Sequence, residues 1–379
     1  MSVEIVPVQS QRELQQFIHL PWQLYRENAY WVAPLLMEEK KRFDSSKNPF
    51  FEHAQVQLFL ALQNGRPVGR ISAQVDRLHN QFHQEQTGFF GFFEAVHAEA
   101  ATGLLESAES WLKEREMKKI HGPFGFNSNG ESGLLIQGFD SLPALMMPYN
   151  PAYYPEFIER CGFAKAKDLL AYALQLDGEC RKRFQELAPR LESISQRAKR
   201  QGVTIRNVNL KDFQGELKRL MEIYNEAWER NWGFVPLTEQ EFMAQAAQLR
   251  QIVVPELAKI VELAAEPIGF GLALPDFHQA LHTIQGRLFP FGIVKLLWNA
   301  RRIDGLRTIT LGVKRAYRKR GVDALLYLEM LRAGLSLTQY KTCECSWVLE
   351  DNDPMNRALA LIGGQVTKIY RVYEKIINY

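Results

Sequence analysis

The sequence predicts a mixed α/β protein that is built from two similar halves. The chain has 379 residues, which exceeds the roughly 100 to 200 residues of a typical domain and suits two. Its content of 46% hydrophobic and 23% charged residues is that of an ordinary globular protein with buried cores. The same order of strand and helix patterns occurs on each side of a polar, basic stretch. We therefore expect two tandem α/β domains.

The first half carries the first copy of this pattern. Alternating hydrophobic residues over 55–76 predict two strands around a turn at Asn64 and Gly65. Apolar residues at helical spacing predict a helix over 103–119. The other expected elements are strands at 87–96, 119–126 and 168–176 and a short helix at 155–163. These elements predict an N-terminal domain over residues 1–178.

The second half repeats the order. A hairpin over 259–275 is followed by a strand at 307–313 and a helix at 321–335. The remaining expected elements are a strand at 340–350, a helix at 353–364 and a strand at 365–377. They predict a C-terminal domain over 204–379. The basic residues 179–203 between the domains predict an exposed linker helix, with phosphate binding as the alternative role.

A cluster of positive charge stands where the strand of the second half feeds its helix. Arg315, Arg318, Lys319 and Arg320 surround Gly321 there. A helix start presents free backbone N–H groups and partial positive charge, and glycine allows a ligand to approach closely. Cationic side chains in a first turn oppose the helix dipole unless an anion binds. The pattern therefore predicts a phosphate-binding turn, with a solvated helix start as the alternative.

Residues 313–326 resemble the coenzyme A pyrophosphate loop of the GNAT acetyltransferase superfamily. In that loop Arg or Gln, two residues, Gly, one residue, and Gly or Ala join the fourth strand to the next helix. Arg318 and Gly321 match this pattern, whereas Asp323 stands where the family has Gly or Ala. The departure at Asp323 affects one backbone contact of the loop.

The next block of the family resembles residues 348–364. Asn352 follows the predicted strand as the family's Asn does, and Gly363 closes a short helix. Leu359 occupies the place where many members carry a tyrosine that protonates the departing thiolate. Over the first half the resemblance is limited to the order of the elements and to residues 148–163.

The resemblance implies two tandem GNAT-like domains that transfer an acyl group, most simply acetyl, to a primary amine, with acetyl-CoA as the co-substrate. The backbone of residues 311–313 would pair with the pantetheine arm, and one N–H group would polarise the thioester carbonyl. The cofactor-binding residues that the resemblance implies are Leu311, Gly312, Val313, Arg318, Lys319, Arg320, Gly321, Val322, Asp323, Ala324 and Asn352.

The first copy lacks a corresponding basic loop. After its third expected strand it carries Glu99, Glu106 and Glu109, and no Arg or Lys occurs before Lys113. Acidic residues repel a pyrophosphate. We therefore expect a degenerate N-terminal domain and one cofactor per chain.

Candidate acid and base residues lie near the end of the chain. An amine must lose a proton before it attacks, so a carboxylate is expected after the strand at 340–350. Glu350 is the candidate base, and Asp353 is expected to cap the following helix. With leucine in place of the usual tyrosine, Tyr370 or Tyr373 is a candidate proton donor, although both suit packing along a strand.

Polar and aromatic residues in turn-rich segments suggest an acceptor pocket, although the same residues form ordinary turns. The candidates are Asn127, Asn129, Glu131, Tyr149, Asn150, Tyr154, Asn231 and Trp232. The segment 275–305 is longer than a hairpin connection needs, so we expect it to form a flap beside the acceptor site.

Composition narrows the classes of partner. A formal net charge of +3 gives no support to a nucleic-acid partner. No apolar run has membrane-spanning length and no secretory signal is visible, so we expect a cytoplasmic protein with no membrane partner. His79 and His83 could clamp a metal ion, but no third ligand is evident and no metal is expected. The expected partner is a small-molecule or peptide amine, and the protein is expected to be a monomer or homodimer.

Two other functions remain open at this point. A Fem-type aminoacyl ligase has two GNAT-like copies and uses an aminoacyl tRNA, which would require a basic groove. A catalytically silent sensor of acyl-CoA or of an amine would tolerate Asp323 and Leu359. Release of free thiol in the presence of an amine distinguishes the enzyme from the sensor.

Overall fold

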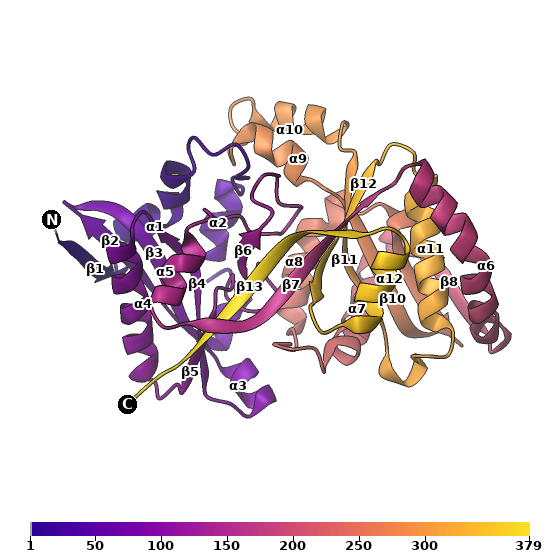
Figure 1. Cartoon of the computed structure of the whole chain (residues 1–379), viewed down its shortest axis with the longest axis horizontal. Coiled ribbons are helices and arrows are strands. Elements are labelled where there is room, and N and C mark those ends of the chain that lie inside the picture. Colours follow the sequence, from indigo (N-terminus) through magenta and orange to yellow (C-terminus); the bar gives the residue numbers. More distant parts are fainter. Residues whose placement is uncertain (1) are drawn as a thin grey trace. The chain divides into compact units, whose positions relative to one another are not determined.

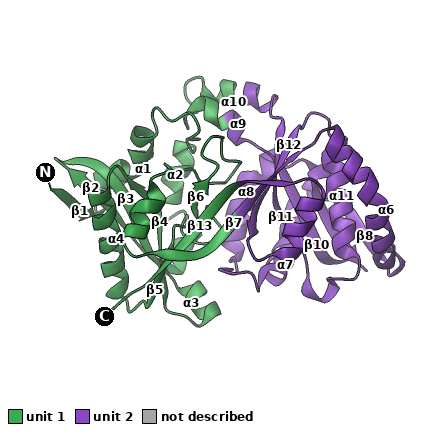
Figure 2. Cartoon of the chain, viewed as in Figure 1, with its two compact units in different colours: residues 1–169, 281–297, 368–379 green, residues 170–280, 298–367 purple. Residues whose placement is uncertain are grey.

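The computed structural model describes residues 2–379, which form two compact units (Figure 1, Figure 2). Within the described chain, unit 1 comprises residues 2–169, Leu281–Leu297 and Lys368–Tyr379, and unit 2 comprises Leu170–Ala280 and Trp298–Thr367. Both combine a β-sheet with helices. The mixed α/β class predicted from the sequence is confirmed.

The boundaries of the units differ from those predicted at 178 and 204. Strand β7 (Ala164–Gln175) begins in unit 1 and continues in unit 2. Strand β13 (Gln365–Ile376) begins in unit 2 and ends in unit 1, where it pairs antiparallel with β5 (Lys119–Gly122). Hydrophobic periodicity predicts that a segment is a strand, but it does not reveal which sheet the strand joins. The last residues were placed in the C-terminal domain by their position in the chain, whereas Lys368–Tyr379 belong to unit 1.

Unit 1 contains the sheet order β1-β2-β3-β4-β5-β13, with β6 also paired to β13. Strands β1 to β4 are antiparallel neighbours, and β4 and β5 run parallel. The strands are β1 (Val3–Pro7), β2 (Ala54–Gln63), β3 (Arg66–Asp76), β4 (Thr87–Ala95) and β6 (Leu134–Gln137). The helices are α1 (Gln11–Leu24), α2 (Leu36–Arg42), η1 (Pro49–Glu52), α3 (Arg77–His83), α4 (Ala98–Lys113) and α5 (Tyr154–Arg160).

Helix α4 supplies much of the core of unit 1. Its Leu104, Leu105 and Leu112 are buried in one cluster with side chains of the sheet. The helix begins five residues before the predicted start, because the side chain of His97 accepts the N–H group of Ala100 and caps it. It ends early as well, since the chain turns at Glu116, whose φ is 62°.

Unit 2 contains the sheet order β7-β12-β11-β10-β9-β8. Its strands are β8 (Val203–Asn207), β9 (Ala258–Leu263), β10 (Glu266–Pro275), β11 (Gly305–Val313) and β12 (Thr342–Leu349). Its helices are α6 (Gly178–Arg200), η2 (Leu210–Asp212), α7 (Phe213–Trp228), α8 (Glu239–Leu249), η3 (Arg250–Ile252), η4 (Pro255–Leu257), η6 (Arg315–Tyr317), α11 (Val322–Ser336) and α12 (Asp353–Leu361). Between β10 and β11 lie α9 (His278–Leu281), η5 (His282–Ile284) and α10 (Gly292–Ala300).

The predicted linker is helical, but it belongs to unit 2. Helix α6 begins at Asp177, whose carboxylate accepts the N–H group of Cys180 at 2.9 Å. Its Ser195 and Ala198 are buried, and the helix packs against α11. Among the described residues, no helix has both the length and the apolar character that a membrane span requires.

Candidate functional site

The site begins where two parallel strands of unit 2 separate. β11 and β12 pair from Gly305↔Thr342 to Thr308↔Cys345, where the ladder ends in the described part of the chain. β11 nevertheless continues to Val313, and its other edge stays paired with β10. The end of β11 therefore keeps one edge that does not pair with β12.

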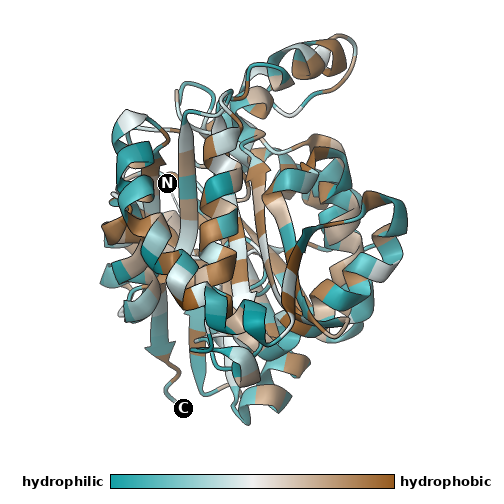
Figure 3. Ribbon diagram, turned by 90° about the vertical axis from the view of Figure 1, so that its right-hand side faces the viewer, coloured by the Kyte–Doolittle hydropathy of each residue, from teal (hydrophilic) through white to brown (hydrophobic). Residues whose placement is uncertain are grey.

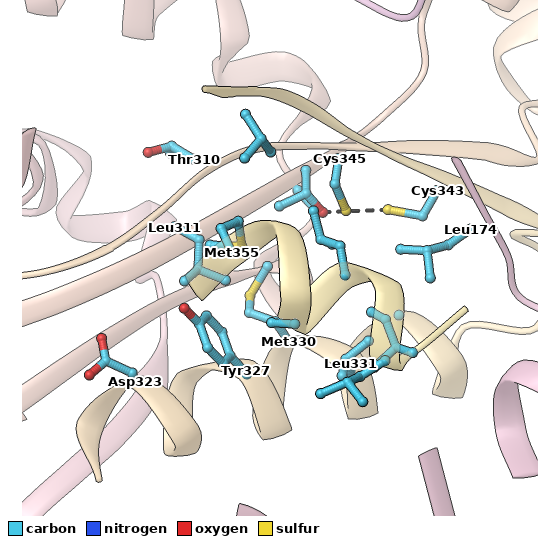
Figure 4. A pocket seen from close by; sticks show the side chains of 18 of the residues that line it. Leu174, Thr310, Leu311, Asp323, Tyr327, Met330, Leu331, Cys343, Cys345 and Met355 are labelled. Carbon is cyan, nitrogen blue, oxygen red and sulfur yellow. Dashed lines mark hydrogen bonds between the residues drawn. The ribbon is translucent and has the colours of Figure 1, made fainter. Parts of the chain in front are cut away.

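A cavity of about 560 Å³ opens at this divergence. Residues of β7, α6, β11, α11, β12 and α12 line it, and all of them belong to unit 2. Most of the lining is apolar, and representative side chains are Leu174, Leu187, Leu311, Met330, Leu331 and Leu359. The charged residues of the lining are Arg190, Lys319 and Asp323. In Figure 4, Asp323 lies at one end of the view, and Leu174, Cys343 and Leu331 lie toward the other.

The turn that leads into α11 has the glycine that its geometry requires. Gly321 caps the helix with a φ of 89°. A Cβ atom at this position would overlap the carbonyl oxygen of Ile194 on α6. Both the left-handed backbone and the close approach of α6 therefore exclude a larger residue.

The side chains of Arg318 and Asp323 form hydrogen bonds within and around this turn. The guanidinium of Arg318 donates to the carbonyl of Val313 at 2.9 Å and also to that of Ala227. The backbone N–H of Lys319 donates to the carboxylate of Asp323 at 3.1 Å. Asp323 thus accepts a loop N–H group that the family resemblance would offer to a phosphate. Lys319 and Arg320 remain as exposed cations beside the helix start.

The other residues suggested for the cofactor occupy several environments. Leu311 and Ala324 line the cavity, while Val313 and Val322 are buried. A Cβ atom on Gly312 would overlap the ring of Trp228. Asn352 lines the cavity, and its side chain accepts the N–H group of Met355 at the start of α12.

The candidate base Glu350 and the candidate proton donors Tyr370 and Tyr373 lie in different units. Glu350 follows β12 directly and stands in the chain between the lining residues Leu349 and Asn352, but it is not itself part of the lining. Tyr370 is fully buried on β13 in unit 1, opposite Leu135 of β6. This position matches the packing role of Tyr370 that the sequence also allowed.

Most of the acceptor candidates in unit 1 make structural contacts. Asn150 accepts the N–H of Leu135 at 2.7 Å and donates to its carbonyl at 3.1 Å. The hydroxyl of Tyr154 donates to Glu94 at 2.8 Å. Tyr149 donates to the carbonyl of Phe139 at 3.2 Å. Asn150 and Tyr149 thus bond to backbone groups, and Tyr154 bonds to a buried carboxylate.

The remaining candidates are divided between the units. In unit 1, Asn127 accepts the N–H of Asn129, and Glu131 lies 3.6 Å from Arg42. In unit 2, Asn231 lines the cavity, and Trp232 follows it in the chain. Among the eight acceptor candidates, Asn231 is therefore the one that the structure brings to the cavity.

Sequence reasoning missed the contribution of α6 and of two thiols. Leu187, Leu191 and Ile194 of α6 line the cavity, and their spacing of four and three residues is the signal that could have identified an apolar face. Cys343 and Cys345 line it from β12. Hydrogen bonding between the two thiols lowers the pKa of Cys343 and raises that of Cys345.

Two curated relatives match nearly the whole chain, whereas no family model matches it. The chain is 38% identical over 375 residues to Protein YghO of Escherichia coli (strain K12), which covers 97% of this chain and 94% of the relative. It is 37% identical over 386 residues to the bacterial ceramide synthase of Caulobacter vibrioides (strain NA1000 / CB15N), which covers 99% of this chain and 98% of the relative.

Solved structures identify the fold. A tandem GNAT protein from the clavulanic acid biosynthesis pathway has a TM-score of 0.56 at 13% identity and covers 100% of this chain and 99% of its own. A GCN5-related N-acetyltransferase from Anabaena variabilis ATCC 29413 has a TM-score of 0.54 at 10% identity and covers 99% of this chain and 73% of its own. The tandem GNAT fold predicted from the sequence is confirmed.

Proposed function

Because this chain belongs to the family of tandem GNAT-fold proteins that includes the bacterial ceramide synthase of C. vibrioides, we propose that it transfers a long-chain acyl group from a coenzyme A thioester to the primary amine of a long-chain amino alcohol. The observation that carries this proposal is the apolar cavity of about 560 Å³ at the divergence of β11 and β12. An acetyl group has one methyl to bury, whereas each further methylene buried contributes about 0.8 kcal/mol. A long acyl chain can bury many methylenes against this apolar lining, and an acetyl group cannot.

Some residues at the cavity favour binding of a coenzyme A thioester, and one residue, Asp323, opposes it. Backbone groups of residues 309–313 on the edge away from β10 are available to an extended arm. Lys319, Arg320 and the start of α11 supply positive charge for phosphates. Asp323 opposes them, because its carboxylate holds the N–H group of Lys319. Binding of a phosphate at this turn requires that hydrogen bond to open.

The chemistry then rests on positioning. When bound, the thioester supplies an activated carbonyl carbon and a thiolate leaving group. A backbone N–H group of β11 polarises the carbonyl oxygen, and the apolar walls exclude water from the reacting atoms. Glu350 takes the proton of the attacking amine, directly or through a water. Leu359 lacks a proton to donate, so the thiolate is protonated by solvent in this scheme.

A catalytically silent acyl-CoA sensor is the second candidate. The hydrogen bond from the Lys319 N–H group to Asp323 is the observation that favours it. A carboxylate at this turn weakens phosphate binding, and weak, reversible binding suits a sensor. Release of free thiol in the presence of an amine separates the two functions. Saturable binding of the thioester without thiol release would favour the sensor.

The proposal is tested by the dependence of turnover on acyl chain length. Free thiol release is measured with coenzyme A thioesters from two to eighteen carbons and with sphinganine as the amine. We expect kcat/KM to rise by up to about tenfold for each two methylenes until the cavity is filled. Equal use of the acetyl and palmitoyl thioesters would contradict the proposal.

A variant that fills the cavity sharpens this test. Gly334 lines the cavity, and no atom lies within 4 Å of a Cβ added there. Gly334→Phe should therefore shift the preference toward shorter acyl chains. Gly178→Phe is the matched control, because Gly178 is a helical glycine with equally open surroundings outside the cavity lining. The control should keep the preference of the parent protein.

A further inference from the structure

The most exposed apolar side chains of the protein gather in one short segment. Of the fifteen large hydrophobic residues that are exposed in the described chain, six lie between residues 289 and 298. Phe289 and Phe291 are 88% and 78% exposed, and they precede α10. Figure 3 colours much of this helix as hydrophobic. We call residues 287–302 the interfacial segment.

Helix α10 adds an apolar stripe to the two phenylalanines. Ile293, Val294, Leu297 and Trp298 are exposed, and their spacing places them on one side of the helix. None of the described residues of α10 is buried. Burial within this chain therefore does not account for the apolar residues, and contiguous exposed patches of this kind mark interaction surfaces.

The charged residues of this stretch of the chain have a single sign. From Phe277 to Ile303 the chain has no Asp or Glu, while Arg287, Lys295, Arg301 and Arg302 are basic. The guanidinium of Arg302 lies 5.3 Å from the ring centre of Trp298. The apolar stripe is thus flanked by cations.

A second basic feature of unit 1 adjoins the start of the segment. Arg287, Leu288 and Phe289 line a cavity of about 890 Å³ together with residues of α1 and α2. Lys40 and Lys41 of α2 belong to the same lining, as do Lys47 and the Asp44 with which Lys47 pairs. Lysines therefore outnumber acidic residues in this lining, although Lys41 also pairs with Glu38.

We propose that the interfacial segment binds to the surface of a bilayer that contains anionic lipids. Aromatic and aliphatic side chains beside Lys and Arg are the composition of helices that lie in the membrane interface, where the apolar face enters the boundary between headgroups and acyl chains. Basic residues near such a surface are attracted by anionic headgroups. This binding departs from the expectation of no membrane partner drawn from the sequence, and it stands independently of acyl transfer.

Charge argues against a second copy of the chain as the occupant. A symmetric dimer through this surface would bring together two identical basic segments without acidic residues of their own. Like charges placed together in an interface disfavour association. An anionic lipid surface instead attracts the same basic residues.

Vesicle co-sedimentation of the full chain tests the proposal. The two vesicle types are an equimolar mixture of phosphatidylglycerol and phosphatidylcholine, and phosphatidylcholine alone. We expect the protein to bind the anionic vesicles, and to bind less when the salt concentration is raised, since salt screens the contribution of the basic residues. No binding of the parent protein to the anionic vesicles would overturn the proposal.

Two sets of substitutions locate the binding surface. Combined Phe289→Ser, Phe291→Ser, Leu297→Ser and Trp298→Ser should weaken the partition coefficient at least tenfold without lowering the melting temperature, because these side chains are exposed. Combined Arg287→Gln, Lys295→Gln, Arg301→Gln and Arg302→Gln should weaken binding to anionic vesicles and reduce its dependence on salt.

A matched control uses equally apolar residues elsewhere. Val96→Ser with Ile376→Ser removes two other exposed aliphatic side chains and should leave vesicle binding unchanged. Equal binding by the parent and the four-serine variant would overturn the proposal. So would a dimer, seen by light scattering, that the four serines abolish while the parent protein ignores vesicles.

Discussion

The two units differ at the place where the parallel pairing of two strands ends. We call this place the gap of each sheet. In unit 1, β4 and β5 pair from Thr87↔Lys119 to Phe89↔His121, and the chain after β5 stays against β4. The N–H group of Phe124 donates to the carbonyl of Phe90 at 2.9 Å. In unit 2, β11 and β12 separate and a cavity remains. One copy fills the gap with its own backbone, and the other keeps it open.

The polar residues near these two gaps also differ between the units. In unit 1, the buried carboxylate of Glu94 accepts hydrogen bonds from Tyr25 at 2.6 Å and Tyr154 at 2.8 Å. In unit 2, Lys319 and Arg320 are exposed beside the glycine-capped start of α11. At these positions, unit 1 has a buried carboxylate bonded to two tyrosines, whereas unit 2 has a cation, Lys319, in the lining of its cavity.

The largest expected effect tests the filled gap. A Cβ atom on Gly91 of β4 would overlap the carbonyl oxygen of Phe124. Gly91→Ala should therefore lower the free energy of unfolding by about 3 kcal/mol or more, measured by chemical denaturation. Gly334→Ala in the open gap should instead raise it by about 0.5–1 kcal/mol, since alanine favours helix. Equal effects of the two substitutions would contradict the comparison.

A second prediction concerns the carboxylate assigned to the reaction. Glu350→Gln should lower the rate of acyl transfer by about a hundredfold and leave the affinity for the acyl thioester nearly unchanged, as loss of a general base would. Steady-state kinetics and calorimetry measure the two quantities. Glu94→Gln in unit 1 is the control and should leave the rate unchanged. Full turnover of Glu350→Gln would remove Glu350 from the mechanism.

A smaller effect is expected at the turn before α11. Asp323→Ala removes a negative charge and frees the N–H group of Lys319 for a phosphate. Coenzyme A thioesters should bind about three- to tenfold more tightly, which corresponds to roughly 1 kcal/mol. Asp323→Asn keeps an acceptor without the charge and should lie between the parent and the alanine variant. Weaker binding by Asp323→Ala would show that the carboxylate assists the ligand.

The smallest effect is a dependence of stability on pH in unit 1. Burial raises the pKa of Glu94, so the folded state holds the proton more strongly than the unfolded state. The contribution of this bound proton to the free energy of unfolding is fully present below the ordinary carboxyl pKa of about 4.3. It is lost as pH rises through the raised pKa. Glu94→Gln keeps an acceptor for both tyrosines without the charge. Its free energy of unfolding, relative to the parent, should therefore increase from pH 4 to pH 7.

The pH prediction is checked by denaturation at several pH values. Glu99→Gln, at an exposed position in the same unit, serves as the control and should follow the parent protein. A constant difference between Glu94→Gln and the parent across the range would contradict the assignment to Glu94.

Local features of the fold could be read from the sequence. The turn at Asn64 and Gly65 and the strands on both sides of it were predicted, because hairpins depend on neighbouring residues. Gly321 was singled out for the same reason, since a glycine before a helix marks a special backbone conformation. In each case the signal lies within a few residues of the feature.

Features that depend on distant residues were not predictable in this way. The pairing of β13 with β5 joins residues 251 or more positions apart, and the contact between His121 and Glu374 is one example. The guanidinium of Arg318, for which the sequence predicts a phosphate contact, donates to the carbonyls of Val313 and Ala227, and the distant partner Ala227 was not predicted. The spacing of Leu187, Leu191 and Ile194 indicates an apolar face on α6, but which cavity this face lines depends on the elements that pack against it.

Hydrogen exchange, measured by mass spectrometry with and without a long-chain acyl thioester, tests the contrast between the two gaps most directly. A ligand that binds in the open gap of unit 2 should slow exchange in β11, the start of α11, β12 and α12. Residues 87–95 and 119–126 of unit 1 should exchange at the same rate in both samples. Equal protection of both units, or protection of unit 1 alone, would contradict the account.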